Sequence, residues 1–236
     1  MILETISSPA DLRALSHEQL EVLAAEMRTL IVEAVTANGG HLGSNLGVVE
    51  LTLALHRVFD SPRDIILWDT GHQTYPHKMV TGRAKGFENL RRAGGMSGYP
   101  SRDESEHDWI ENSHASTVLS YAFGLATAEA SSQGTGRRVV AVIGDGSMTG
   151  GMAFEGLNNL GHSGRDCIII LNDNGRSYAP TISKLGESLV RIRNNPVYMR
   201  RQARLERALA EMPVVGGLAE RGMEATKAAI RELWEP

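Results

Sequence analysis

The sequence predicts an α/β fold in which a parallel sheet is covered by helices on both faces. Three stretches carry this prediction: "DIILWDTG", "RRVVAVIGDG" and "DCIIILNDN". Their apolar runs are continuous rather than alternating, which is typical of strands buried on both faces. Segments with helical periodicity lie between the runs, so the strands are expected to pair in parallel.

The expected helices follow from capping signals and from the spacing of apolar residues. Ser16, followed by Gln19 three residues later, forms a capping-box pattern at the start of the first helix. Two glycines at 39 and 40 end this helix. Further helices are expected over residues 47–59, 116–130 and 151–162. The second of these three is rich in small residues, which suit close packing on a sheet.

The pattern changes after Thr181. Residues 182–236 are mostly helical in pattern and contain no further apolar strand. We therefore expect residues 1–181 to form an α/β domain with an incomplete sheet, and residues 182–236 to form a helical arm or excursion. The basic run at residues 191–207 is more typical of a solvated helix face than of a polyanion site.

Composition excludes several classes of partner. The net charge is −4, so there is no basic footprint for nucleic acid. No apolar run approaches the ~20 residues of a membrane span. The first residues lack the pattern of a signal peptide, and we expect a cytoplasmic protein. Cys167, the one cysteine, is expected to be a small core residue.

Chemistry is predicted where the strands end. In "VVAVIGDGSMTGG" a carboxylate, Asp145, stands between Gly144 and Gly146, which let a large group approach closely. The helix that follows can turn its amides toward a phosphate. One helix and one return strand later come Asn172, Asp173 and Asn174, and Asp69 ends the first strand. Carboxylate, amide and phosphate oxygens together suit Mg²⁺.

These motifs, taken together, resemble the 1-deoxy-D-xylulose-5-phosphate synthase family of transketolase-like thiamine diphosphate enzymes. The resemblance runs through residues 10–185, and the variants "ENSHAS" and "NDNGRSYAPT" are similar to its actinobacterial branch. The matching stretches are "GGHLGSNLGVVELTLALHRVFDSPRD", "DTGHQTYPHKMVTGR", "GGMSGYPSRDESEHDW", "SHAST", "VIGDGSMTGGMAFEGLNN" and "LNDNGRSYAPT".

The resemblance implies a thiamine diphosphate-binding fold and a role for each matching position. Asp145 and Asn174 would ligate Mg²⁺, with the backbone carbonyl of Arg176 as a third ligand. Gly146 and Ser147 would contact the diphosphate, beside Gly144.

The resemblance also implies which residues lie toward the reacting end. His72 would face the cofactor, and Ser113, His114 and Ala115 would line its pocket. His41 would lie near the reacting carbon as a proton donor or acceptor, work that suits an imidazole with an ordinary pKa of ~6.5. His41, His72 and His114 are thus the candidate catalytic residues.

Several of these residues have a plainer reading. His41 and His72, judged alone, are more typical of loop histidines bonded to backbone, and only their motifs favour a site. His77 and His107 are expected to be structural, and His17, His56 and His162 to be surface or helix positions. The carboxylates of residues 104–106 fit either acid–base work or a salt-bridged turn.

The resemblance implies that further modules are needed. A full synthase of this family also has a pyrimidine-binding module with an activating glutamate and a C-terminal domain, which we do not find in this sequence. We expect a second chain to carry them in a hetero-oligomer that joins two carbons from pyruvate to an aldehyde such as glyceraldehyde 3-phosphate. The alternatives are a transketolase-type subunit with a ketol donor and a non-catalytic assembly subunit.

Overall fold

A computed structural model describes residues 1–131 and 133–173 of the chain. Asn174, Arg176 and the boundary expected at residue 181 lie outside these residues, as does the expected helical arm. The described helices are α1 His17–Asn38, α2 Gly43–Leu46, α3 Val49–Val58, α4 Tyr75–Lys78, α5 Val118–Glu129 and α6 Gly151–Ser163. The described strands are β1 Ile65–Trp68, β2 Val139–Gly144 and β3 Ile168–Asn172.

The three strands form one parallel sheet in the order β1-β2-β3, as the sequence predicted. Trp68 pairs with Val142 and Gly144 pairs with Asn172, so all three carboxyl ends reach the same edge. β1 and most of β2 are buried. β3 is only half-buried, and Ile168 at its start is 42% exposed. The described sheet therefore has one less covered edge.

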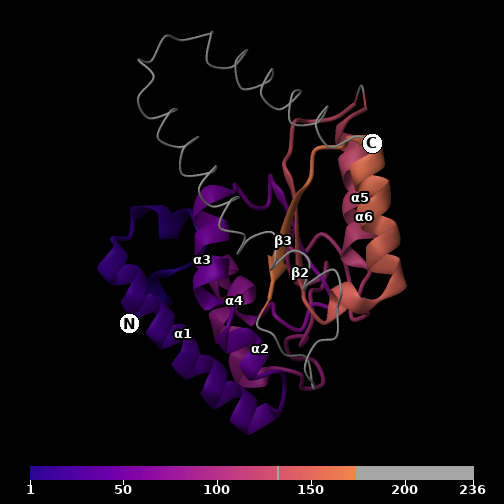
Figure 1. The fold of residues 1–236 in the computed structure, drawn as a ribbon. Coiled ribbons are helices and arrows are strands. Elements are labelled where there is room, and N and C mark those ends of the chain that lie inside the picture. The colour runs from indigo at the N-terminus through magenta and orange to yellow at the C-terminus, as the bar shows by residue number, and fades with distance from the viewer. Residues whose placement is uncertain (132, 174–236) are drawn as a thin grey trace, which may run out of the picture. The chain divides into compact units, whose positions relative to one another are not determined.

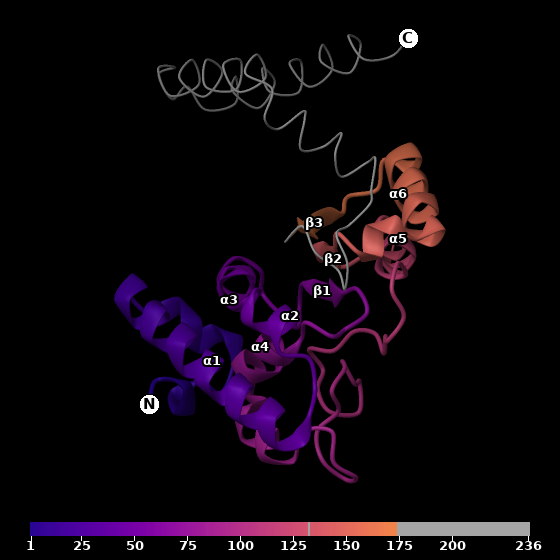
Figure 2. The ribbon, with the colours of Figure 1, turned by 60° about the horizontal axis from the view of Figure 1, so that its bottom comes forward.

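Helices cover both faces of this sheet, which confirms the predicted architecture (Figure 1). α5 and α6 pack together, and α5 lies on β1 and β2. On the opposite face, Leu55 of α3 and Phe59, which follows this helix, pack against Trp68 and Val140. Figure 2 shows the strands between α3 on one side and the α5–α6 pair on the other.

α3 also belongs to a second apolar core. Its residues Val49 and Leu53 pack with α1 residues such as Met27 and Ile31, all of them at most 4% exposed. α1 begins at the predicted capping box: the Ser16 hydroxyl accepts the Gln19 N–H, and Gln19 Oε1 accepts the Ser16 N–H. α3 thus joins the N-terminal helices to the sheet.

The burial of two side chains qualifies the sequence predictions. His56 lies in a helix, as one of the expected alternatives had it, but its side chain is fully buried. Cys167, expected in the core, is half-buried, and burial raises the pKa of its thiol to about 11. Among the described residues, no helix combines the length and apolar character that a membrane span would need.

The contact between α5 and α6 depends on Gly156, which is buried. A Cβ at this position would lie 2.8 Å from the Leu119 Cβ and 3.1 Å from the Ser120 nitrogen of α5. We expect Gly156→Ala to lower the free energy of unfolding by about 1–3 kcal/mol, because α5 backbone must move to admit the methyl group.

Gly161 is the matched control because it lies in the same helix, is exposed and has nothing within 4 Å of its Cβ position. We expect Gly161→Ala to raise stability by about 0.5–1 kcal/mol through helix propensity. Urea unfolding of both variants measures the difference, and equal effects at the two positions would contradict the close-packing explanation.

Candidate functional site

The ends of the three strands lie side by side. Asp69, directly after β1, donates its N–H to the Val142 carbonyl at 2.8 Å. Asp145, directly after β2, donates its N–H to the Asn172 carbonyl at 3.1 Å. Asp145 itself is half-buried. The "GDG" and "NDN" stretches therefore lie side by side at Asp145 and Asn172.

Asp69 has a structural task at this edge. Its carboxylate accepts the N–H groups of Ser116 at 2.9 Å and Val118 at 3.0 Å, and the Thr70 hydroxyl at 2.9 Å. The side chain is only 4% exposed. A carboxylate at the first turn of a helix accepts hydrogen bonds from otherwise unpaired amides and interacts favourably with the positive end of the helix dipole. Asp69 thus fixes the start of α5 to the end of β1.

Ser116 extends this connection to the loop after β2. Its hydroxyl donates to the Ser147 carbonyl at 2.6 Å, and the Ser147 hydroxyl lies 3.4 Å from the Thr70 hydroxyl. Ser116 has φ of +71°, which is uncommon for a residue with a side chain. A Cβ on Gly150 would clash with the Ser116 hydroxyl, so the glycine there permits the approach. Ser147 is buried within this convergence of loops.

Ser113, His114 and Ala115 form an exposed turn just before α5. The side chain of Asn112 accepts the His114 N–H at 3.0 Å, and the Thr117 hydroxyl donates to the His114 carbonyl at 2.9 Å. The turn is thus held through its backbone. Within the described residues, the His114 ring does not stack on the ring of His41 or His72.

His41 and His72 are brought together, although 31 positions apart in sequence numbering. Their ring centroids lie 5.7 Å apart, edge to face, and the ring of Tyr99 lies 5.6 Å from that of His41. Burial lowers the pKa of both imidazoles, helped by Arg91 at His41 and by His41 at His72. Both rings are therefore uncharged at neutral pH, and each carries one donor and one acceptor nitrogen.

Each of these two histidines has an unsatisfied polar atom. Nδ1 of His41 and Nδ1 of His72 are buried and lack a hydrogen-bond partner among the described residues. Buried polar atoms in proteins are nearly always satisfied, so an exception calls for an explanation. A bound polar ligand would supply the missing partner.

Gln73 connects His72 to the strand ends. Its Oε1 accepts from the Asn172 side chain at 3.2 Å, and its Nε2 lies 3.4 Å from His72 Nε2. A Cβ on Gly144 would approach Gln73 Nε2 at 3.6 Å. The histidine pair and the ends of β2 and β3 therefore belong to one neighbourhood.

The described part of that neighbourhood holds one of the three expected metal ligands, Asp145. Asn174 and Arg176 lie outside it, and the described residues alone contain no group of three metal-binding His, Cys, Asp or Glu side chains. The half-buried Asp145 carboxylate suits a cation, and the glycine-flanked turn and the unsatisfied histidine atoms suit a polar ligand beside it.

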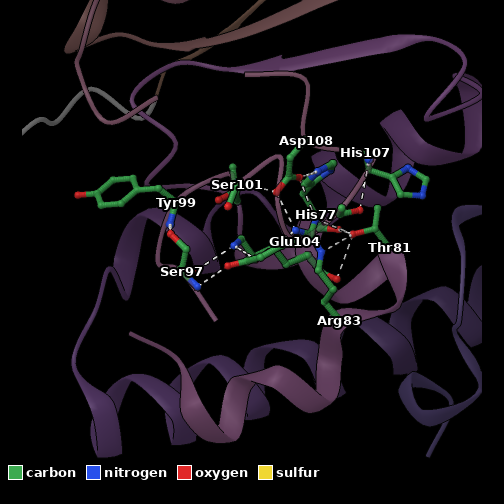
Figure 3. A network of polar contacts seen from close by, with 12 residues as sticks. His77, Thr81, Arg83, Ser97, Tyr99, Ser101, Glu104, His107 and Asp108 are labelled. Carbon is green, nitrogen blue, oxygen red and sulfur yellow. Dashed lines mark hydrogen bonds and ion pairs between the residues drawn. The ribbon is translucent and has the colours of Figure 1, made fainter. Parts of the chain in front are cut away.

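Sequence reasoning missed a polar network that includes buried His77 and Asp108 (Figure 3). Asp108 lies at its centre, where Arg83 binds the carboxylate with two nitrogens, at 2.7 and 2.9 Å. Burial disfavours the charged form, but hydrogen bonds from His77 and Arg83 outweigh it and hold the pKa of Asp108 well below its usual range. Asp108 is therefore an ionised carboxylate in the interior.

The ionised Asp108 fixes the protons on two histidines. Its Oδ1 lies 2.9 Å from His77 Nε2, which must donate because a carboxylate only accepts. His77 Nδ1 is then the acceptor for His56 Nε2 at 2.9 Å. Burial lowers the pKa of both imidazoles. In the hydrogen-bonded series of His56, His77 and Asp108, the two histidines are therefore neutral and only the carboxylate is charged. The structural role expected for His77 agrees with this arrangement.

The same network holds the loop that carries Tyr99. Glu104 accepts from Lys78 Nζ at 2.6 Å and from the Ser97 N–H at 2.6 Å, and Asp108 accepts the Ser101 N–H at 2.8 Å. Glu104 thus follows the salt-bridged reading of residues 104–106. The side chains of Lys78 and Asp108 are fully buried, but no helical or strand periodicity in the sequence marks these positions as buried.

Comparison with known proteins decides the family. The family model described as 1-deoxy-D-xylulose-5-phosphate synthase matches residues 3–236. The chain belongs to this family.

Curated relatives agree with the assignment. The 1-deoxy-D-xylulose-5-phosphate synthases of Mycobacterium avium (strain 104) and Mycobacterium leprae (strain Br4923) are 58% and 56% identical over 235 residues. These alignments cover all of this chain but only 37% and 36% of the relatives. The chain therefore spans little more than a third of the length of these synthases.

A solved structure shows the same fold. Transketolase from Campylobacter jejuni matches with a TM-score of 0.61 at 21% identity, covering 80% of this chain and 32% of that protein. This likeness confirms the transketolase-like α/β fold expected from the sequence.

The buried histidines predict how stability depends on pH. The folded pKa values of His56 and His77 are lowered, whereas the unfolded chain has ordinary values of about 6.5. The contribution of these two histidines to the free energy of unfolding is complete above about pH 6.5. It is lost as the pH falls toward their pKa values in the folded chain. Each group adds a slope of at most about 1.4 kcal/mol per pH unit.

We expect His56→Gln to lose less stability than the wild type between pH 6.5 and 5, because the amide can still donate to His77 but does not titrate. Urea unfolding at several pH values measures the slope. The exposed His162 of α6 provides the control, since His162→Gln should keep the wild-type slope. A wild-type slope in His56→Gln would contradict the argument.

Proposed function

We propose that this chain is the diphosphate-binding part of a thiamine diphosphate- and Mg²⁺-dependent 1-deoxy-D-xylulose-5-phosphate synthase-type transferase. The reaction joins a two-carbon unit from pyruvate to an aldehyde such as glyceraldehyde 3-phosphate. The observation that carries the proposal is the edge where Asp145 bonds to Asn172, whose side chain bonds to Gln73 next to His72. Family membership supplies the reaction class.

The residues divide into two ends of one site. At the diphosphate end, Asp145, Asn174 and the carbonyl of Arg176 would hold Mg²⁺, and Gly146 and Ser147 would contact the diphosphate. At the other end, His72 would face the cofactor, with the turn of Ser113, His114 and Ala115 beside it. Bound thiamine diphosphate supplies a nucleophilic carbon, which no amino-acid side chain provides.

The protein's own contribution is placement and proton transfer. His41 and His72 are neutral near pH 7 because burial lowers their pKa values. A neutral imidazole can donate at one nitrogen and accept at the other, so either ring can move a proton to or from a substrate oxygen. The two rings lie edge to face, with their centroids 5.7 Å apart, so both imidazoles face the same small region.

The segments by which the curated relatives are longer would supply the rest of the active enzyme. We propose that they act together with this chain, joined to it or carried by a second polypeptide in a hetero-oligomer. They would bring the pyrimidine-binding module, the activating glutamate and the C-terminal domain. The substrates are small molecules.

The metal assignment is tested with Asp145→Asn in the assembled enzyme. We expect the affinity for thiamine diphosphate in the presence of MgCl₂ to fall by at least about tenfold, since even groups that only support metal ligands cost 10–100-fold. Isothermal titration calorimetry measures this loss. The control is Asp166→Asn, an exposed carboxylate at the opposite end of β3. Unchanged affinity and activity in Asp145→Asn would favour a non-catalytic assembly role.

The reaction is tested by completing the enzyme. We would co-express this chain with the remaining two thirds of the Mycobacterium avium relative and assay product formation from pyruvate and glyceraldehyde 3-phosphate. The expected result is turnover that requires both polypeptides. Turnover only with a ketol donor would identify a transketolase-type enzyme instead, and an assembled, cofactor-loaded complex inactive with both donors would contradict the proposal.

A further inference from the structure

Asn45 is a fully buried polar side chain that sequence analysis gave no role. Its Nδ2 donates to the His41 carbonyl at 2.6 Å and to the His72 carbonyl at 2.8 Å. Its Oδ1 accepts the Tyr75 N–H at 2.9 Å. The orientation of the amide is unambiguous, because carbonyl oxygens require the NH₂ group and a backbone N–H requires the oxygen.

The three partners of Asn45 come from two separate parts of the fold. His41 lies in the loop between α1 and α2, whereas His72 and Tyr75 belong to the turn and short helix that follow β1. In the described residues, no backbone–backbone hydrogen bond joins residues 39–48 to residues 69–76. Asn45 makes two of the three recorded hydrogen bonds between these segments.

The third of these bonds completes a closed unit. The Tyr75 hydroxyl accepts the His41 N–H at 3.3 Å, so His41 is held at both its N–H and its carbonyl. Gly40 makes room for that hydroxyl, because a Cβ there would contact it. Its φ of +140° also favours glycine. The backbone carbonyls of His41 and His72 therefore accept hydrogen bonds from the same carboxamide, that of Asn45.

We propose that Asn45 is a positioning residue that sets the spacing and mutual orientation of the His41 and His72 rings. This inference rests on the proposed function, in which the two imidazoles serve the reaction. Without the carboxamide, two part-buried carbonyls and the buried Tyr75 N–H would lose these hydrogen bonds, a loss that proteins offset by moving or admitting water. The two loops would then separate.

Separation of the loops would have a measurable chemical effect. The rings lower each other's exposure to water, and His41 lowers the pKa of His72 directly, with Asp69 acting in the opposite direction. A looser pair would be better solvated, so both pKa values would rise toward about 6.5. Misplacement of a reacting group by about 1 Å can cost 10²-fold in rate.

The test uses Asn45→Leu, which has a similar size and adds no charge, in the assembled enzyme. Asn45→Ala is the second variant, because it leaves space for a water that can satisfy the exposed backbone groups. Histidine-selective NMR titration of the cofactor-free enzyme gives the pKa values of His41 and His72, with signals assigned through His41→Gln and His72→Gln. Steady-state kinetics gives kcat and the KM for pyruvate.

Thr52→Val is the matched control. Thr52 of α3 is fully buried, and its hydroxyl donates to the carbonyl of the N-cap residue Val48 at 2.7 Å and bonds to neither histidine. This change should lower stability while leaving both titrations and kcat unaltered. In the Asn45 variants we expect both pKa values to rise and kcat to fall by about 10²-fold.

Unchanged histidine titrations in both Asn45 variants would overturn the proposal, whatever happens to activity, because the pair would then be positioned by something else. The proposed function fails by a different result, namely full activity in His41→Gln and His72→Gln. Raised pKa values in the Asn45 variants, together with that result, would support the link between the loops and overturn its catalytic purpose.

Discussion

Parallel pairing of three strands brings Asp69, Asp145 and Asn172 to a single edge of the sheet. In an antiparallel arrangement, neighbouring strands would end on opposite edges and these side chains would lie far apart. Parallel strands require crossover connections, and here the connections themselves carry the other candidate residues. The connection from β1 to β2 contains His72 and the turn of Ser113 to Ala115, while the α1–α2 loop adds His41.

Buried polar side chains give this edge its rigidity. Asp69 joins β1 to α5, Asn45 joins the His41 loop to the His72 turn, and Asp108 anchors the loop that places Tyr99 against His41. Each would be costly to bury alone, and each is offset by two or more hydrogen bonds. Since hydrogen bonds are directional, they restrict the arrangement of the loops. Apolar packing, such as that between α3 and the sheet, is non-directional and restricts the arrangement less.

Much of the fold could be predicted because it follows from local patterns. The apolar runs identified β1, β2 and β3, and the spacing of small and apolar residues identified α1, α3, α5 and α6. The motif around Asp145 identified the carboxylate edge. The short helices α2 and α4 escaped prediction because four residues show no periodicity. The burial of His56 was not predicted because helical spacing alone does not reveal that α3 packs against two apolar cores.

The sequence by itself determined the α/β class, the parallel sheet, the family and the strand end at which Asp145 stands. These depend on the order and character of residues along the chain, which folding does not alter. Only the tertiary structure decided that Asp69 caps α5 instead of facing a ligand, that His41 meets His72, and that Asn45 holds both. The reason is physical: a hydrogen bond between residues 27 positions apart, such as that from Asn45 to His72, leaves no periodic trace in the sequence.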